Sequence, residues 1–455
     1  MSSVVAADLT VATTTEAGAH HAPASASVRP SLPASVDVAI IGGGCSGTAT
    51  AVRLAALPGH RDVLLLEGRS GDDPRSWCSW DDGTDPLPEA RSAGWDRWEV
   101  RSDRGVATGT DPQHPYVLVR AADRRAAAEA RLGADGPVGI VHGAPVSAVT
   151  PLDTDAGVLV RSAAGTVRAG TVLDARGPRC PGHVPRGRVL LHQRFVGQWI
   201  STETPVFDTS TVTLMDFVGR RQDGRVAFVY VLPVSTTSAL VESTVFTSDE
   251  ADPFDHRTAI AEYVRHRWGL ERSAWAVDEE ESGCIPMTDA PATSLTAPSL
   301  TATAAGSAAA RPAAAGSATA TATVVGTTRP SSGYGFARSN RHSETVARAL
   351  ADGTAVPPFR DRPRTAFLDA VFLRFLRDRP AEAPEAFRRL FGLPGPLVVR
   401  FLSERSGILD ELRIVCALPK VPFLAALVVM VVERRPRPGA RRRAPGRRAQ
   451  QGASS

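Results

Sequence analysis

The hydrophobic pattern near the start of the chain predicts a strand, a tight turn, a helix and a second strand. Residues 36–41, "VDVAII", form an apolar run typical of a short buried strand. The small and apolar residues of "TATAVRLAAL" then repeat at helical spacing, and Pro58-Gly59 is expected to end that helix. The run "RDVLLLEG" predicts a second strand, which ends at Glu67. This order and length match the start of a dinucleotide-binding fold.

Further along, the pattern predicts antiparallel strands and then helices. Residues 138–176 contain strand-like runs, and residues 211–247 alternate such runs with turns, including a "QDG" turn that suits a hairpin. We expect the second block to form an antiparallel sheet that faces a substrate. Residues 341–353 and 364–380 have helical period, with Pro380 at the end of the second helix.

Three stretches lack the pattern of a folded core. Residues 1–35 are small and polar, with neither a basic n-region nor an apolar h-region, so we expect a disordered leader and no signal peptide. Residues 290–323 are almost wholly Ala, Thr, Ser, Gly and Pro, which predicts a flexible insertion. Residues 414–432 are apolar but interrupted by Pro419, Lys420 and Pro422, and the unbroken part is too short for a confident membrane span.

Composition limits the classes of protein to consider. Of the 455 residues 43% are apolar, which is enough for a large core. The net charge is +4, yet residues 434–455 alone contain eight arginines and no acid, so the rest of the chain is net negative. We expect a disordered arginine-rich tail that is separate from the fold, and no nucleic-acid partner. The five cysteines form no C-x-x-C pair, which argues against a disulfide framework and a zinc site.

The turn after the first strand, "GGGCSG", carries a dinucleotide-binding pattern. Gly42 permits the tight turn, Gly44 lets the backbone approach a pyrophosphate, and Gly47 lets the helix lie close to the strand. The helix N-terminus then offers free N–H groups to the phosphates. Glu67 lies twenty residues beyond Gly47, where a carboxylate accepts a hydrogen bond from a ribose hydroxyl. An acid at this position favours FAD or NAD over NADP.

Two later stretches favour FAD over NAD. "TVLDARG" places Asp174 and Gly177 at a strand end, as in the second nucleotide contact of many flavoproteins. "GTTRPSSGYGFARS", with Pro330 and Gly333, is a Gly/Pro turn before a helical run, similar to the late flavin-contacting segment of those proteins.

Several stretches in order resemble one known family, the bacterial lycopene cyclases of carotenoid synthesis. They are "DVAIIGGGCSG", "LLLEGRSGDDPRSWCSW", "TVTLMDF", "FVYVLPVSTTSALVESTVF", "GCIPMTDAP", "RPSSGYGFARSNRHS" and "FLDAVFLRFLRDRP", and they cover most of residues 36–425. A generic Rossmann flavoprotein would not reproduce the LMDF, Y-V-L-P and A-L-V-E-x-T segments together. The chain departs from the family in a short glycine run before Arg329 and in its arginine tail.

The resemblance implies an α/β fold in which a Rossmann-type FAD-binding domain is interleaved with an antiparallel-sheet (α+β) substrate domain, followed by a helical C-terminal part. We expect the segments to divide as leader 1–35, nucleotide-binding domain 36–200, substrate sheet 201–289, insertion 290–323, flavin-contacting return and C-terminal helices 324–433, and tail 434–455. The C-terminal helices include the apolar segment expected to associate with a membrane.

The resemblance also implies site residues. Glu242 in "ALVESTVF" matches the family's essential acid, and Asp216 in "LMDF" matches another acidic position. The family often has a second acid beside the first, where this chain has Ser243. A carboxylic acid in an apolar pocket can stay protonated near neutral pH and protonate an alkene. From the residues alone, an outward-facing strand carboxylate at position 242 stays an alternative.

A tryptophan-rich segment resembles a family segment near the flavin. It is "WCSWDDG", with Trp77, Trp80, Asp81 and Asp82. Tryptophan faces suit a polyene or a passing cation, although two ordinary, partly buried tryptophans are an equal alternative.

The implied activity is closure of the acyclic ψ ends of lycopene to β-rings, giving γ-carotene or β-carotene without net redox change. The implied cofactors are FAD in its reduced form and NAD(P)H as reductant, with no metal. Because lycopene and other acyclic carotenoids dissolve in lipid, we expect peripheral or monotopic association with a membrane lipid surface on the cytoplasmic side. The alternatives are a related FAD-dependent prenyl reductase or monooxygenase, or a non-catalytic homologue with a degraded flavin site.

Overall fold

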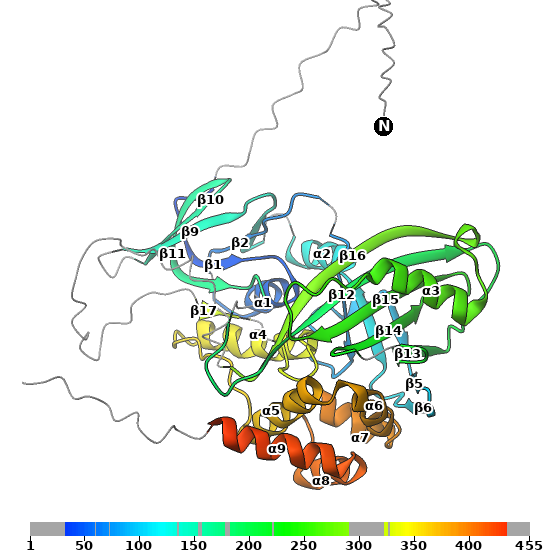
Figure 1. Cartoon of the computed structure of the whole chain (residues 1–455). Helices are drawn as coiled ribbons and strands as arrows, with labels where there is room; N and C mark the ends of the chain where they lie inside the picture. Colours follow the sequence, from blue (N-terminus) through cyan, green and yellow to red (C-terminus); the bar gives the residue numbers. More distant parts are fainter. Residues whose placement is uncertain are drawn as a thin grey trace, which may run out of the picture.

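The protein is described by a computed structural model over residues 32–434, without 60, 72, 134–135, 153–156, 178–182, 221–222, 291–322 and 326–327. The expected leader, insertion and arginine-rich tail therefore lie almost wholly outside the described residues. Within the described part, the sheet that carries the glycine turn lies beside a larger, mostly antiparallel sheet, and a group of C-terminal helices lies against the latter (Figure 1).

The predicted strand–turn–helix–strand unit is confirmed in the first sheet. β1 is hydrogen-bonded in parallel to β2 on one side and to β11 on the other. The strand order is β8-β2-β1-β11-β10-β9, and β17 pairs with the end of β11. The strands are β1 (Ser35–Ile41), β2 (Val63–Leu66), β8 (Val138–Val141), β9 (Val146–Pro151), β10 (Val158–Ser162), β11 (Gly165–Asp174) and β17 (Thr323–Val324).

Among the described residues, three helices cover one face of this sheet. They are α1 (Cys45–Ala56), α2 (Ala121–Leu132) and α4 (Phe336–Ala351). Buried residues of all three helices pack together with Val38, Ile40 and Leu65 of β1 and β2. The chain therefore returns to the nucleotide-binding unit late, through α4, as the interleaved fold requires. Helix α1 ends just before Pro58, as the sequence predicts.

The larger sheet has the strand order β16-β12-β15-β14-β13-β5-β6. Its pairings are antiparallel except for β13 with β5, which run parallel. The strands are β5 (Arg97–Ser102), β6 (Gly105–Thr110), β12 (Leu190–Thr202), β13 (Thr211–Asp216), β14 (Val226–Pro233), β15 (Ser238–Thr247) and β16 (Trp275–Thr288). The sheet therefore includes β5, β6 and most of β12, which precede the expected boundary at residue 201.

The two faces of the larger sheet are covered by different helices. α3 (His256–Trp268) packs on one face, called the outer face here, together with Val229 and Val241. The other, inner face, with Tyr230 and Phe246, packs against the C-terminal helices. A small sheet with the order β3-β7-β4 lies beside it, built from β3 (Ser76–Trp80), β4 (Ala93–Trp95) and β7 (Tyr116–Arg120). Short 3₁₀ helices occur at Pro88–Ala90, Arg272–Ala274 and Pro380–Glu382.

The C-terminal helices confirm the predicted breaks at Pro380 and Pro419, whereas the predicted break at Pro422 is wrong, because this proline lies in the first turn of the last helix, where it is tolerated. They are α5 (Pro363–Asp378), α6 (Ala383–Phe391), α7 (Gly395–Leu402), α8 (Ile408–Ala417) and α9 (Lys420–Arg434). α5 ends just before Pro380, and Pro419 separates α8 from α9. None of the described helices is by itself long and apolar enough to cross a membrane, while α8 and α9 satisfy the length and composition criteria only as a pair bent by 114°.

Candidate active site

Backbone packing explains two of the three glycines that form the dinucleotide-binding pattern, Gly42 and Gly47. Gly42 has φ +100°, and a Cβ there would lie 3.1 Å from the carbonyl oxygen of Ala175. A Cβ at Gly47 would overlap the carbonyl oxygen of Gly42. Only glycine therefore fits at position 47, because α1 starts in direct contact with the turn.

Gly44 differs, because the protein itself leaves room there. A Cβ at Gly44 would meet only Cζ2 of Trp77, at 4.0 Å. Gly44 is the N-cap of α1, and none of the described side chains caps this helix end or places an acid in its first turn. The Ser46 hydroxyl in that turn is buried and has no hydrogen-bond partner among the described residues. Open space, free N–H groups and an orphaned hydroxyl fit a dinucleotide phosphate.

Glu67 lies where the sequence places it, at the end of β2 beside the turn. Its Oε2 accepts a hydrogen bond from the Gly43 N–H at 2.6 Å, and its Oε1 accepts one from the Arg69 N–H at 2.8 Å. The carboxylate therefore fixes the turn while staying only partly buried. Each oxygen retains a lone pair that a ribose hydroxyl could use, although that contact stays a prediction.

The end of β11 brings Asp174 and Gly177 close to the same turn. Asp174 is paired in register with Ile41, the last residue of β1. Its two carboxylate oxygens accept hydrogen bonds from Arg176 at 2.9 and 2.8 Å, so Asp174 already has an ionic partner. Gly177 follows with φ +86°. Both residues lie near the nucleotide turn, and their contact with FAD stays a prediction.

Pro330 and Gly333 lie in the loop that leads into α4. Gly333 has φ +70°, and a Cβ there would overlap Oε1 of Gln193 on β12. This loop is therefore pressed against the larger sheet. Arg329, just before Pro330, is buried, and its Nη2 lies 3.0 Å from Oδ1 of Asp369 on α5. The ion pair fixes the loop between the sheet and the C-terminal helices.

Glu242 lies on the inner face of the larger sheet. It is directly opposite Tyr230 of β14 and Gly197 of β12, and Gly197 is in turn opposite Glu281 of β16. Because directly paired residues share a face of a sheet, Glu242 and Glu281 flank a residue that has no side chain. Two strand spacings, about 10 Å, separate their backbones, and two glutamate side chains can close that gap.

The surroundings of these two acids favour a proton on Glu242. Burial, and after it the negative charge of Glu281, raise the pKa of Glu242 to about 8, against a weaker opposing hydrogen bond from Thr244. That bond joins Thr244 Oγ1 to Glu242 Oε1 at 2.7 Å. Burial also raises the pKa of Glu281, opposed by hydrogen bonds from Ser76. Glu242 is therefore protonated at neutral pH, and the residue remains partly exposed, which leaves it within reach of a ligand.

Strand β3 connects the acids to the nucleotide turn. The N–H and hydroxyl of Ser76 donate to the two oxygens of Glu281 at 2.7 and 2.6 Å. The next residue, Trp77, lies beside Gly44 and stacks on Phe336 of α4, with 6.3 Å between ring centroids. A dinucleotide bound at the turn would therefore lie one residue of β3 away from the group that holds Glu281.

Trp80 and the two aspartates after it have partners within the protein. The Trp80 ring lies 4.9 Å from that of Tyr116 and 5.7 Å from that of Tyr334, centroid to centroid. Asp81 forms an ion pair with Arg91 at 2.7 Å, and Asp82 with Arg341 at 2.5 Å. Trp80 thus belongs to an aromatic core beside the acids, and the aspartates stabilise the segment.

Asp216 is not brought together with Glu242. It is paired in register with Val229, whose side chain packs on the outer face, so Asp216 also points toward α3. There it accepts a hydrogen bond from the Tyr263 hydroxyl at 2.9 Å and lies 3.1 Å from Nε of Arg101. A buried carboxylate with these partners stabilises the packing of α3 on the sheet. The structure therefore separates the two acids that the sequence proposes together.

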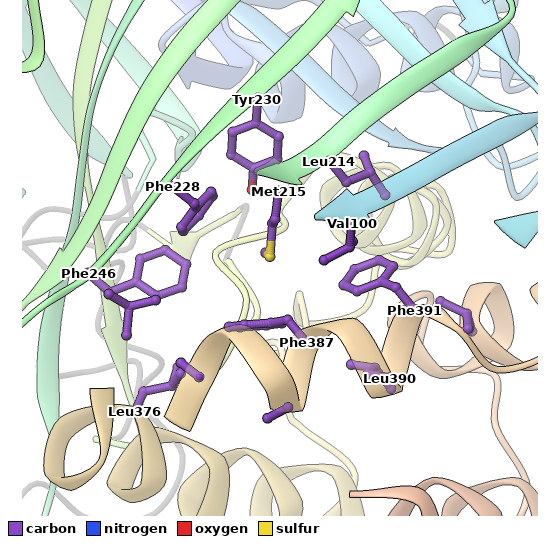
Figure 2. Close-up of a cluster of buried hydrophobic side chains, with 14 of the residues drawn as sticks. Val100, Leu214, Met215, Phe228, Tyr230, Phe246, Leu376, Phe387, Leu390 and Phe391 are labelled. Carbon is purple, nitrogen blue, oxygen red and sulfur yellow. The ribbon is translucent and has the colours of Figure 1, made fainter. Parts of the chain in front are cut away.

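An apolar cavity of about 350 Å³ lies between the inner face of the larger sheet and the C-terminal helices. Figure 2 shows side chains of the sheet, among them Met215, Phe228 and Phe246, facing Phe387 and Leu390 of α6. Met215, Phe246, Phe387 and Leu390 line the cavity, together with residues of α5, α8 and α9. Such a lining suits an extended hydrocarbon.

The cavity reaches the acids through two tyrosines. Tyr230 and Tyr334 both line it, and the charge of Glu242 contributes to the raised pKa of each phenol, after the larger effect of burial. Tyr230 is also directly opposite Glu242 in the sheet. A hydrocarbon in the cavity could therefore bring one end close to the protonated carboxyl.

Sequence reasoning missed Glu281 and Gly197. Glu281 ends a run of four acids, Asp278 to Glu281, which is typical of a solvated stretch. The two acids that precede it do have basic partners, since Glu279 pairs with Arg120 and Glu280 with Arg257. A usable signal was Gly197, because a glycine inside a long strand often marks a place where another group comes close.

Sequence comparisons give one consistent result. A family model described as "Lycopene cyclase protein" matches residues 37–428. A lycopene beta-cyclase from Paracoccus sp. (strain N81106 / MBIC 01143) is 29% identical over 416 residues, which is 86% of this chain and 96% of that protein. A lycopene beta-cyclase from Pseudescherichia vulneris is 27% identical, over 85% of this chain and 95% of that protein.

Comparisons with solved structures concern the fold alone. A geranylgeranyl bacteriochlorophyll reductase-like protein from Thermoplasma acidophilum has a TM-score of 0.55 at 13% identity, covering 87% of this chain and 99% of that one. A flavoprotein/dehydrogenase from Cytophaga hutchinsonii has a TM-score of 0.52 at 13% identity, covering 88% and 100%. These similarities agree with the predicted α/β FAD-binding fold.

Proposed function

The chain belongs to the lycopene cyclase family, and we propose that it closes the ψ ends of lycopene to β-rings with Glu242 as the proton donor. The matched residues 37–428 include the nucleotide turn, both large sheets and α5 to α8. The observation that carries the assignment is a carboxyl on the inner sheet face whose pKa is raised to about 8, mainly by burial. At neutral pH this group keeps the proton that an alkene must receive.

The proposed reaction moves protons and changes no oxidation state. Glu242 gives its proton to the terminal double bond of the ψ end, which leaves a tertiary carbocation. The neighbouring double bond attacks that cation and closes the six-membered ring. Loss of a ring proton to the carboxylate left at Glu242 then restores a double bond. The product is an isomer of the substrate.

The apolar cavity supports a carotenoid as the substrate. Its lining is aromatic and aliphatic over most of its surface, and it extends from Tyr230 at the sheet to Leu424 at the molecular surface. The aromatic face of Tyr334, which lines the cavity and lies near Glu242, can stabilise a passing cation. Water, which would quench a carbocation, finds few polar groups there.

The nucleotide turn supports FAD as the cofactor. Gly44 with its open space, the start of α1 and the Ser46 hydroxyl would hold the pyrophosphate, and Glu67 the ribose. Bound in its reduced form, which NAD(P)H would maintain, FAD supplies negative charge that stabilises a cation formed nearby. Trp77 lies between this turn and the acids and would position the two sites relative to each other.

We also propose that the protein associates with the cytoplasmic surface of a membrane through α8 and α9. Apolar side chains on these helices are unusually exposed, including Leu409 at 72%, Val421 at 78% and Leu424 at 60%. Leu424 and Val415 also line the cavity, so the exposed apolar face continues into it. A substrate that dissolves only in lipid could enter along this path.

The test of the proposed function is product analysis with purified, flavin-loaded protein and lycopene under reducing, oxygen-free conditions. The expected product has the mass of lycopene, because ring closure is an isomerisation. A gain of hydrogen would instead identify the alternative prenyl reductase, whose fold the reductase-like protein shares, and a gain of oxygen would identify a monooxygenase.

The matched variants for this test are Glu242→Gln and Glu280→Gln. Glu242→Gln keeps the shape of the side chain and removes its acidity, so turnover should fall by about 10²–10⁴-fold with flavin content unchanged. Glu280 is paired with Arg257 on a more exposed part of β16, so its variant should turn over like the wild type. Wild-type turnover in Glu242→Gln would remove Glu242 as the proton donor.

A further inference from the structure

Glu281 is an unusual residue for a position with only a structural role. It is 4% exposed, and the described residues offer it no ion pair. Among the described residues, its carboxyl is held by the N–H and the hydroxyl of Ser76, and it shares the inner sheet face with a second carboxyl. A buried acid that faces a second acid and has no ion-pair partner among these residues destabilises a fold, so the proximity of the two calls for a functional reason.

We propose that Glu281 is a positioning residue for the cyclisation: as an ionised carboxylate fixed by Ser76, it keeps the reacting proton on Glu242. This inference rests on the proposed role of Glu242. The asymmetry of the pair comes from its hydrogen bonds. Glu281 accepts two, from a backbone N–H and a hydroxyl, whereas Glu242 accepts one, from Thr244. More donors stabilise the anion at Glu281, so the single proton resides on Glu242.

Gly197 makes the arrangement possible. A Cβ at this position would lie 3.2 Å from Cγ and 3.4 Å from Oε1 of Glu281, and 3.0 Å from a methyl group of Leu240. Any larger residue would therefore fill the space across which the two carboxyls interact. The missing side chain lets the charge of Glu281 act on Glu242 through a region of low dielectric constant.

The charge balance of the proton transfer fits this role. Before transfer the pair holds one proton and one negative charge. When Glu242 protonates the alkene, the pair becomes two carboxylates and the substrate carries one positive charge. The two anions attract the cation and repel each other, which favours return of the ring proton to Glu242 at the end of the reaction. No oxidant or reductant takes part in these steps.

The other titratable groups around the pair stay neutral or are paired. Cys78 of β3, Tyr116 of β7, Tyr230 of β14 and Tyr334 before α4 face Glu242 or its neighbours, and burial raises the pKa of each. Near Glu281, Arg120 forms an ion pair with Glu279, and Arg75, which also interacts with Glu281, forms one with Asp73. The alkaline limb of the rate–pH profile should therefore report the Glu242–Glu281 pair.

The experiment compares rate–pH profiles of flavin-loaded wild type, Glu281→Gln and Glu280→Gln. In Glu281→Gln the charge is gone while burial of Glu242 remains, so the alkaline limb should move to lower pH by about one unit. A one-unit shift lowers the rate above that limb about tenfold relative to the rate at pH 6. Glu280→Gln should keep the wild-type profile. Ser76→Ala, which removes one donor from Glu281, should shift the limb in the same direction by less.

An infrared titration without turnover, using protein labelled at glutamate carboxyls, measures the pair independently of the reaction. A protonated carboxyl band should titrate near pH 8 in the wild type, disappear in Glu242→Gln, and titrate at lower pH in Glu281→Gln and Ser76→Ala. If Glu281→Gln does not fold, Ser76→Ala and this titration decide the question.

Two results would overturn the inference while leaving the proposed function intact. One is an unchanged alkaline limb and an unchanged band in both variants. The other is an equal loss of rate at every pH without a shift of the band, which is what a merely structural Glu281 would give. An active Glu242→Gln would instead overturn the proposed function, and the band would still show whether the two carboxyls are coupled.

Discussion

A proton held on Glu242 at neutral pH has a cost in stability. The pKa of this carboxyl is raised in the folded protein to about 8 from an ordinary 4.5. Between pH 4.5 and pH 8 the folded state therefore keeps a proton that the unfolded chain releases. Protonation spares the fold the cost of burying a charged carboxyl. This stabilisation is complete below pH 4.5 and is lost as pH rises through 8. Catalytic acidity and stability at alkaline pH are thus opposed in one residue.

The unfolding free energy of the wild type should accordingly fall between pH 5 and pH 9, by on the order of 3 kcal/mol from this residue. Glu242→Gln should flatten the curve and be the more stable protein at pH 9, because an amide has no charge to bury. Urea unfolding at pH 5, 7 and 9 measures this, with Glu280→Gln as the control that keeps the wild-type dependence. Parallel curves for Glu242→Gln and the wild type would show that position 242 does not carry a buried titrating acid.

Sequence and structure agree at the residue scale where a rule is local. Gly47 is set by a contact within one turn, and Gly42 by the positive φ of that turn, so a motif of six residues predicts them. Glu281 and Asp216 depend on the register of strands far apart in the chain, which a single sequence does not contain. Register turns Glu281 inward from a run that is typical of solvated acids, and turns Asp216 outward against Tyr263.

At the scale of elements, the start of α1 offers a direct test of the cofactor site. Gly42 and Gly47 are required by the fold, whereas the space around Gly44 is open. Gly44→Val should therefore fold normally but place a branched side chain where a pyrophosphate would lie, and FAD affinity should drop at least about tenfold. Flavin absorbance per mole of protein and the melting temperature measure the two effects separately.

A matched control for this prediction is Gly71→Val, because Gly71 is exposed and a Cβ there would meet no atom within 4 Å. It should keep both flavin and melting temperature. Full flavin content in Gly44→Val would show that the turn does not hold the cofactor. Loss of the fold in Gly44→Val would contradict the statement that the protein itself leaves room at this position.

Periodicity predicts elements well and their partners poorly. The nucleotide-binding unit, α4, α5 and the hairpin of β13 and β14 follow from local pattern and breakers. The pairing of β5 with β13 joins parallel segments about one hundred residues apart. Such strands are not connected by a short turn, so no turn signal in the sequence predicts the pairing. The pattern does not predict β3, because "SWCSW" shows no regular alternation of apolar and polar residues. This strand nevertheless links the nucleotide turn to Glu281.

At the scale of the whole molecule, the features form a series from nucleotide to lipid. The glycine turn lies beside Trp77 of β3, the same strand holds Glu281 through Ser76, and Glu242 faces the tyrosines that line the apolar cavity. The cavity then opens at the exposed apolar side chains of α8 and α9. This order suits a reaction in which the acid must lie between the cofactor site and a cavity that a lipid-soluble substrate enters from the surface.

The lipid end of that series leads to a prediction about membrane binding. Val421 and Val428 of α9 are 78% and 62% exposed and do not line the cavity, and burying each in a bilayer would contribute about 1.5–3 kcal/mol. The double variant Val421→Asp, Val428→Asp should therefore bind lipid vesicles at least about a hundredfold more weakly. Val106→Asp is the control, since Val106 is also exposed, at 46%, but lies on β6 away from α8 and α9.

Vesicle flotation measures binding, and turnover is measured with lycopene in vesicles and with lycopene in detergent micelles. The double variant should lose turnover of vesicle-held lycopene while keeping turnover in micelles, because the cavity and Glu242 are intact. Equal binding by the double variant and the wild type would remove α9 as the membrane contact, and loss of turnover in both media would mean that these side chains stabilise the cavity instead.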